Sequence, residues 1–134
     1  MNNKELQIIV EHLVENASPY LIIMFGSTVK GNLKKDSDFD IAFLSDVNIG
    51  KYELFMTSQE LASKINRNVD LIDLNQANTV FQAQIIHTGK VIYCTDEKKK
   101  AQFELKTLKM YAKLNEERFH IIRNIEESGS IYEK

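Results

Sequence analysis

Residues 20–45 read YLIIMFGSTVKGNLKKDSDFDIAFLS, and they contain two strand patterns joined by a glycine turn and a polar loop. The apolar run at 20–25 predicts a buried strand, which the pair Gly26-Ser27 ends. After a polar loop, residues 38–45 open with an alternating pattern that predicts a second strand. One face of that strand is expected to carry Phe39, Ile41 and Phe43, and the other Asp38, Asp40 and Ala42. Both carboxylates should therefore point away from the face that the aromatic side chains bury.

The rest of the chain alternates between helical and extended patterns. Helices are expected over residues 3–16, 50–66, 75–88 and 96–127, and further strands over 69–74 and 90–94. Asn75 and Asp96 are expected N-caps, and Gly89 is an expected helix stop. The class is therefore α/β (α+β), with a small mixed β-sheet flanked by helices and a long C-terminal helix.

The length of 134 residues suits one domain, and a hydrophobic share of 43% is enough for a core. We expect a catalytic core over residues 1–95, the long helix over 96–127 packing on the core or a partner, and a flexible tail over 128–134. The formal net charge of −2 does not favour direct nucleic-acid binding through an overall basic field.

The cysteine and histidine residues bear on two questions: which metal sites the chain can form, and in which cellular compartment it is expected. Cys94 is the single cysteine, so neither an intrachain disulfide nor a CxxC zinc site can form. No histidine has a metal-ligand partner one helical turn away, and His12 is expected on the polar side of the first helix. With no membrane-spanning stretch and no signal-peptide core, a cytoplasmic protein is expected.

The turn and the carboxylate pair together suggest phosphate chemistry. Glycine allows a close backbone approach, and the Ser27 hydroxyl with free backbone N–H groups could cradle phosphate. Asp38 and Asp40 are separated by one residue, so their side chains would share a face roughly 6.5 Å apart along the strand. Two like charges so placed repel each other unless a cation lies between them, and Mg²⁺ favours carboxylates together with phosphate oxygens.

Gly26-Ser27, ten residues and then Asp38-Phe39-Asp40 resemble the GSx10DxD signature of the minimal nucleotidyltransferases in the DNA polymerase β superfamily. The chain is close to the antitoxin-type members of that family, which are encoded beside a HEPN-domain toxin. The likeness covers nearly the whole chain, from an entry helix to a later strand with a third carboxylate. It implies the nucleotidyltransferase fold.

The resemblance also implies roles for individual residues. Gly26 and Ser27 would bind the triphosphate of ATP, and Asp38 and Asp40 would hold Mg²⁺. The third carboxylate matches Asp70, which would act as a base and could also contact the metal. Asp73 competes with Asp70, but the two residues should face opposite ways, so only one can join the site. The alternative for Asp73 is a turn or cap residue.

The loop between the two motifs departs from the family pattern. Family members often carry an arginine there, whereas this chain has Lys30, Lys34 and Lys35. A lysine meets phosphate as a point charge without a bidentate fork. Lys30 is the best single candidate for nucleotide binding, with solvated loop charge as the alternative for all three. Ser37 could cap or orient the loop.

The implied activity is transfer of AMP from ATP to a tyrosine hydroxyl of a HEPN toxin ribonuclease, which would neutralise the toxin. A hetero-oligomer with that toxin is a further expectation. Two other functions stay open: a nucleotidyltransferase acting on a small molecule such as an antibiotic, and a non-catalytic antitoxin that occludes its partner.

The C-terminal helix carries a basic excess and two apolar stripes, one of which would suffice for docking on the body. One stripe contains Leu105, Leu108, Tyr111, Ala112, Phe119 and Ile122, and the other Phe103, Met110, Leu114, Ile121 and Ile125. The favoured interpretation is an interaction surface. A covering helix with snorkelling lysines is the second, and RNA binding the least favoured.

Overall fold

The computed structural model describes the backbone of residues 3–26 and 38–128, with side chains through Ile121 and at Arg123. The candidate residues Ser27, Lys30 and Ser37 lie outside the described residues, as does the tail at 129–134.

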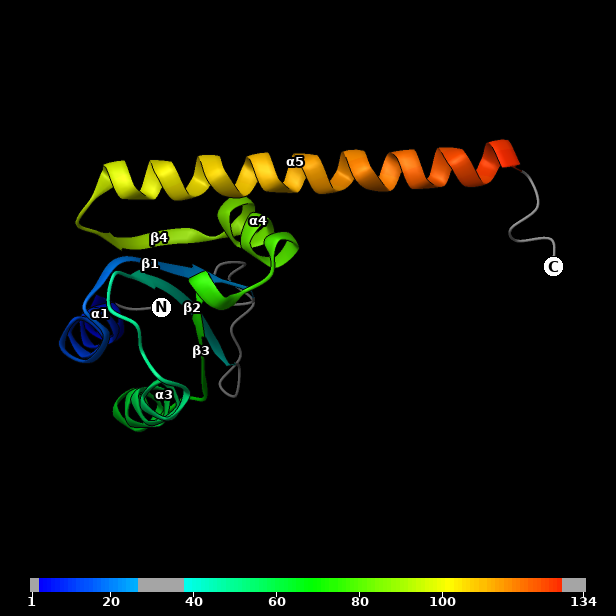
Figure 1. The fold of residues 1–134 in the computed structure, drawn as a ribbon. Coiled ribbons are helices and arrows are strands. Elements are labelled where there is room, and N and C mark those ends of the chain that lie inside the picture. The colour runs from blue at the N-terminus through cyan, green and yellow to red at the C-terminus, as the bar shows by residue number, and fades with distance from the viewer. Residues whose placement is uncertain (1–2, 27–37, 129–134) are drawn as a thin grey trace.

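Helices and strands alternate along the chain as the sequence pattern predicts. They are, in order, α1 (Asn3–Ala17), β1 (Pro19–Phe25), β2 (Phe39–Ser45), α3 (Lys51–Ile65), β3 (Val69–Asp73), the 3₁₀ turn η1 (Leu74–Gln76), α4 (Thr79–Thr88), β4 (Lys90–Cys94) and α5 (Glu97–Ser128). The expected class is confirmed: a small mixed sheet is flanked by helices, and a long helix closes the chain (Figure 1).

The sheet has the strand order β3-β2-β1-β4. β1 pairs antiparallel with both β2 and β4, whereas β2 and β3 are parallel. Because of these directions, the end of β1 and the starts of β2 and β3 all lie at one edge of the sheet. That edge carries the two sequence motifs, so the topology itself gathers the candidate residues.

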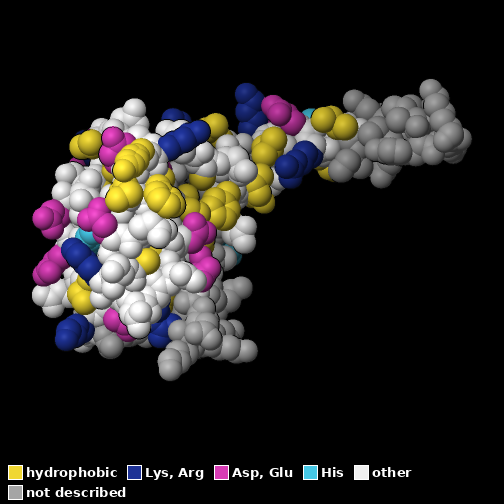
Figure 2. Space-filling model, turned by 90° about the horizontal axis from the view of Figure 1, so that it is seen from below, with side chains coloured by type: hydrophobic (Ala, Val, Ile, Leu, Met, Phe, Trp, Pro, Cys, Tyr) yellow, Lys and Arg dark blue, Asp and Glu magenta, His cyan; other side chains and the backbone are white. Residues whose placement is uncertain are grey.

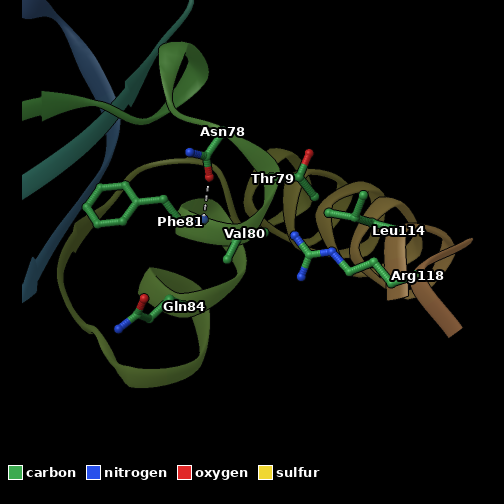
Figure 3. Close-up of a pocket in the computed structure, with 7 residues that line it drawn as sticks. All are labelled: Asn78, Thr79, Val80, Phe81, Gln84, Leu114 and Arg118. Atoms are coloured by element: carbon green, nitrogen blue, oxygen red, sulfur yellow. Dashed lines mark hydrogen bonds between the residues drawn. The ribbon is translucent and has the colours of Figure 1, made fainter. Parts of the chain in front are cut away.

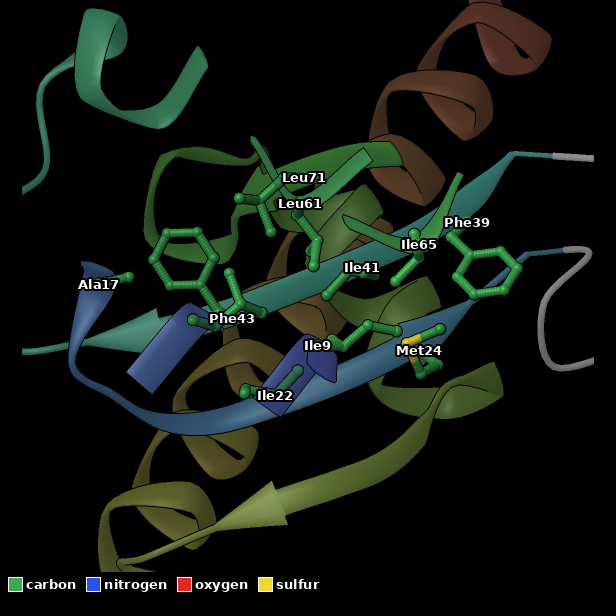
Figure 4. Close-up of a cluster of buried hydrophobic side chains, with 11 residues drawn as sticks. Ile9, Ala17, Ile22, Met24, Phe39, Ile41, Phe43, Leu61, Ile65 and Leu71 are labelled. Carbon is green, nitrogen blue, oxygen red and sulfur yellow. The ribbon is translucent and has the colours of Figure 1, made fainter. Parts of the chain in front are cut away.

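Helices cover both faces of the sheet (Figure 1). α1 and α3 lie on one face, over a buried cluster that includes Ile9, Leu13, Phe39, Ile41, Phe43 and Leu61 (Figure 4). α4 and α5 lie on the other, over a smaller cluster of Leu21, Ile23, Ala42, Leu44, Leu74 and Ile85. Phe39, Ile41 and Phe43 are almost fully buried on the face where the alternation placed them, and each such side chain stabilises the fold by roughly 1.5–3 kcal/mol.

α5 packs on the body only along its first part. Its 32 residues give a length of about 48 Å. Thr107 is buried, but every side chain from Asn115 to Ile121 is exposed. Because β4 runs antiparallel to β1 and α5 turns back on β4, the helix advances in the direction of β1 and projects past its end (Figures 1 and 2). We call residues 110–128 the arm.

Two local predictions were wrong. The helix expected from Asn75 begins at Thr79, and its N-cap is Asn78, whose side chain accepts a hydrogen bond from the Phe81 N–H at 2.8 Å. A 3₁₀ turn comes first, because Leu74 is buried against the sheet and fixes the chain there.

His12 is buried rather than on a polar side. Its Nε2–H donates to the Thr57 carbonyl at 3.0 Å, which leaves Nδ1 to accept from Lys64 Nζ at 2.9 Å. Both partners come from α3, so the burial of this histidine depends on contacts that the local pattern of α1 does not contain.

Candidate active site

The turn after β1 depends on Gly26. Its φ of +65° is a left-handed conformation that residues with a Cβ rarely adopt. A Cβ built on Gly26 would also lie only 2.3 Å from Oδ2 of Asp40. Glycine is therefore required twice here: once for the backbone conformation, and once so that the Asp40 carboxylate can lie against the turn.

A row of residues crosses the sheet at this edge. Phe25 of β1 is the register partner of Asp40 of β2, and Asp40 is the register partner of Asp70 of β3. Register partners in neighbouring strands point to the same face, and adjacent strands lie about 4.8 Å apart. The structure thus brings Asp40 and Asp70 side by side beside Gly26, while Asp38 lies exposed just before β2.

The surroundings of the Asp40 carboxyl make its ionised form unfavourable. Partial burial raises the pKa of the Asp40 carboxyl above its ordinary value, and the neighbouring carboxylates of Asp70 and then Asp38 raise it further. Repulsion among the three residues is what a cation-binding cluster shows when its charge is not neutralised.

Contacts that the sequence pattern did not reveal hold the row in place. The backbone N–H of Phe39 donates to the Asn68 carbonyl at 2.8 Å, which ties the start of β2 to the turn before β3. The Arg67 guanidinium lies over the Phe39 ring, 5.1 Å from its centroid. Ser58 Oγ donates to the Val69 carbonyl at 2.9 Å, directly beside Asp70. The only sequence signal for this turn is Asn66, which ends α3 in a left-handed conformation.

Asp73 lies at the other end of β3, where it pairs with Phe43. Its side chain accepts a hydrogen bond from the Asn75 N–H at 3.1 Å and so caps η1. Burial raises the pKa of Asp73, and the bond from Asn75 lowers it. Asp73 therefore makes the turn contact that was the alternative to a catalytic role.

The donor set suits Mg²⁺. Among the residues that the structure describes, no three carboxylate, imidazole or thiol groups lie close enough to hold an ion by themselves. Mg²⁺ does not need such a cage, because it is usually bound through one or two carboxylates together with substrate phosphates. The mutual repulsion in the Asp40 row is the feature of this structure that a divalent cation would relieve.

Hollows lined by described residues adjoin α4, and two of them are not lined by Asp38, Asp40 or Asp70. One, of about 540 Å³, lies between α4 and α5, and the other, of about 710 Å³, lies between the start of α4 and the start of α3. Both share Phe81, whose ring packs edge-on against Phe25 with centroids 5.8 Å apart. The carboxylate row, rather than either hollow, carries the candidate catalytic groups.

Comparison with known families fits this geometry. The family model described as "Polymerase beta, Nucleotidyltransferase" matches residues 7–98. This range includes the Gly26 turn and all three candidate carboxylates, Asp38, Asp40 and Asp70. The fold and the match together define the class of the protein as a nucleotidyltransferase of the polymerase β type. None of the described helices has the length and apolar run needed to cross a bilayer.

Similar proteins and solved structures show which family of nucleotidyltransferases the chain belongs to. The protein adenylyltransferase MntA of Shewanella oneidensis is 40% identical over 108 residues, which are 78% of this chain and 75% of the relative. A crystal structure of a toxin–antitoxin with AMP-PNP superimposes with a TM-score of 0.79 at 34% identity, covering 90% of this chain and 97% of the other. A structure of a tri-AMPylated Shewanella oneidensis HEPN toxin in complex with its MNT antitoxin gives 0.77 at 32%, covering 93% and 98%. The chain belongs to the MntA family of protein adenylyltransferases.

Proposed function

We propose that this protein transfers AMP from ATP to a tyrosine hydroxyl of a cognate HEPN toxin and thereby neutralises the toxin. The observation that carries the proposal is the row in which Asp40 and Asp70 lie side by side against the Gly26 turn. The chemistry of the acceptor comes from the relatives, since solved neighbours are described as an antitoxin with an AMPylated HEPN toxin.

In this proposal each residue has a separate task. Gly26 and Ser27 hold the triphosphate, helped by Lys30, and Ser37 orients the loop. Asp38 and Asp40 would hold Mg²⁺, with which Asp70 could also make contact, and the ion would neutralise charge on the phosphates. Asp70 is exposed, so it can accept the proton of an incoming hydroxyl.

The atoms balance without a further reagent. The tyrosine oxygen forms a bond to the α-phosphorus of ATP, and the bond from that phosphorus to the bridging oxygen of the β-phosphate breaks. Pyrophosphate leaves, and the hydroxyl proton passes to the Asp70 carboxylate. Most of the rate enhancement would come from positioning and charge neutralisation. We assign this chemistry to residues 1–95 and place it in the cytoplasm, which suits the free thiol of Cys94.

Intact-mass measurement tests the proposal. The purified protein is incubated with ATP, Mg²⁺ and the HEPN protein encoded next to it, and the HEPN protein should gain the mass of one or more AMP groups. The doubly substituted Asp38→Ala/Asp40→Ala protein should leave that mass unchanged and should fail to suppress ribonuclease activity. Suppression by this variant at unchanged mass would instead establish occlusion and overturn the proposal.

A further inference from the structure

The arm overhangs the edge of the sheet that bears the candidate active site. α5 advances in the direction of β1, and its exposed part begins where the body ends (Figure 1). Among the described residues, an angle is visible between the arm and the body (Figure 2), and the end of the sheet that carries Gly26, Asp40 and Asp70 lies on its body side; we call this angle the notch. A molecule that reaches the carboxylates from this side must pass along the arm.

The side of α5 that packs on the body continues unchanged into the notch. Phe103 packs against the second core cluster, and Thr107 is buried beside it. Met110, Leu114 and Ile121 follow at the spacings that keep residues on one face of a helix. Leu114 is half-buried beside α4, but Met110 is 47% exposed and Ile121 is 59% exposed among the residues that the structure describes, so much of this stripe is available for contact.

The inner corner of the notch is the hollow of about 540 Å³ between α4 and α5. Figure 3 shows Leu114 and Arg118 of α5 on one side of it, facing Thr79 and Val80 at the start of α4. The corner therefore combines an apolar floor with a polar rim, which is the usual anatomy of a protein-binding surface.

The arm has the chemistry of a protein-binding surface, because apolar side chains lie beside charged ones of both signs. Over residues 110–128 it carries three Lys or Arg residues against four Glu, a balance of −1, so it has no basic excess. Hydrophobic side chains lie among basic, acidic and histidine side chains along its described part (Figure 2). The part of α5 beyond Leu114 is about 21 Å long, and a single projecting helix of this length is marginal in water unless its apolar face is covered. A partner with an apolar surface and an acidic group opposite Arg118 would complement the apolar stripe and its one charged member.

We infer that the notch face of the arm, formed by Met110, Leu114, Arg118 and Ile121, is the docking surface for the acceptor protein. This inference rests on the proposed function, because it requires that the acceptor is a protein. Docking there would place a surface tyrosine of the acceptor at the edge where Asp40 and Asp70 lie. The outer stripe of α5, which includes Leu105, Leu108 and Phe119, points away from the body and has no part in this contact.

The two stripes provide a matched pair of variants. Leu114→Glu/Ile121→Glu places two charges on the notch face, and Leu108→Glu/Phe119→Glu places two on the outer face. Glutamate is a good helix former, so both proteins should fold, and far-ultraviolet circular dichroism with thermal melting checks this. The probe is the cognate HEPN protein, with the Kd measured in the absence of ATP and AMP transfer measured separately by intact mass.

The notch variant should raise the Kd at least about tenfold and slow AMP transfer correspondingly, whereas the outer variant should stay within about twofold of the unmodified protein. Unimpaired binding by the notch variant, or a loss confined to the outer variant, would overturn the docking surface. So would a dimer of the unmodified protein that the notch substitutions dissociate while AMP transfer persists. Notch-dependent binding without any AMP transfer would support the docking surface while overturning the proposed function, and no binding at all would overturn both.

Discussion

Replacing Gly26 by alanine should separate activity from stability. The left-handed backbone at φ +65° costs a residue with a Cβ about 1–2 kcal/mol, which predicts a Tm lower by roughly 4–8 °C. The close contact between an added Cβ and Asp40 has a different effect from the backbone strain. The atom that a Cβ would meet at 2.3 Å is the carboxylate oxygen at the end of the Asp40 side chain, which can rotate away at little cost in stability. That rotation displaces the group that we assign to Mg²⁺.

The expected signature is therefore a folded protein with a disabled site. A displacement of about 1 Å at a reacting centre costs on the order of 100-fold in rate, so AMP transfer by Gly26→Ala should fall by at least that factor. Intact-mass time courses with the HEPN acceptor measure the rate, and differential scanning fluorimetry measures the Tm.

Gly50 offers a matched control in the same chain. A Cβ there would also lie 2.3 Å from a carboxylate oxygen, that of Glu53, but the backbone φ of −69° is ordinary. Glu53 is exposed and has no assigned task, so Gly50→Ala should leave the rate unchanged. Gly50 is the N-cap of α3, where alanine is less favourable than glycine, so a small fall in the Tm is expected. A Gly26→Ala protein that retains full activity, or a Gly50→Ala protein whose AMP transfer is equally impaired, would show that Gly26 does not position the Asp40 carboxylate.

The remaining predictions concern charge in the carboxylate row. Because the pKa of Asp40 is raised in the folded state, its ionised form destabilises the fold as pH rises above the ordinary carboxyl value of 3.8. Asp40→Asn should therefore raise the Tm at neutral pH in Mg²⁺-free buffer, and it should also abolish AMP transfer. An unchanged or lower Tm would contradict this expectation. Mg²⁺ should raise the Tm of the unmodified protein, by the equivalent of about 2.7 kcal/mol at 100 times its Kd, but should not affect the Asp38→Ala/Asp40→Ala protein. Asp70→Ala should slow transfer by about 10²–10⁴, whereas Asp73→Ala should lose only about 0.5–2 kcal/mol of stability through its cap; comparable rate losses in the two proteins would count against Asp70 as the base.

Much of the fold was predictable because its signals are local. The apolar run at 20–25 and the alternation from Phe39 onward are properties of adjacent residues, and both strands form within a residue or two of the expected limits. Asn75 misled because Asn78, three residues later, is an equally good cap. Only the burial of Leu74 against a distant strand decides between them.

The candidate site likewise has features that local spacing predicts and features that depend on contacts between distant elements. The shared face of Asp38 and Asp40 follows from spacing alone, and the structure places Asp40 opposite Asp70 through the parallel pairing of β2 and β3. Spacing could not reveal that Arg67 covers Phe39, or that Ser58 binds the carbonyl beside Asp70. These contacts join residues from separate elements and exist only once the sheet has formed. The roles of Ser27, Lys30 and Ser37 stay predictions.

The projection of α5 past the body has a consequence for how this chain can change. A helix advances about 1.5 Å and rotates about 100° with each residue. On the docking that we propose, deleting one residue between Thr107 and Met110 would leave the body intact but turn Leu114 and Ile121 out of the notch. Inserting seven residues would restore the direction of the stripe and carry it about 10 Å further out. The number of residues between the body and the arm thus sets the direction in which the stripe points. On this docking, binding of the acceptor would tolerate insertions or deletions only in steps of about two helical turns.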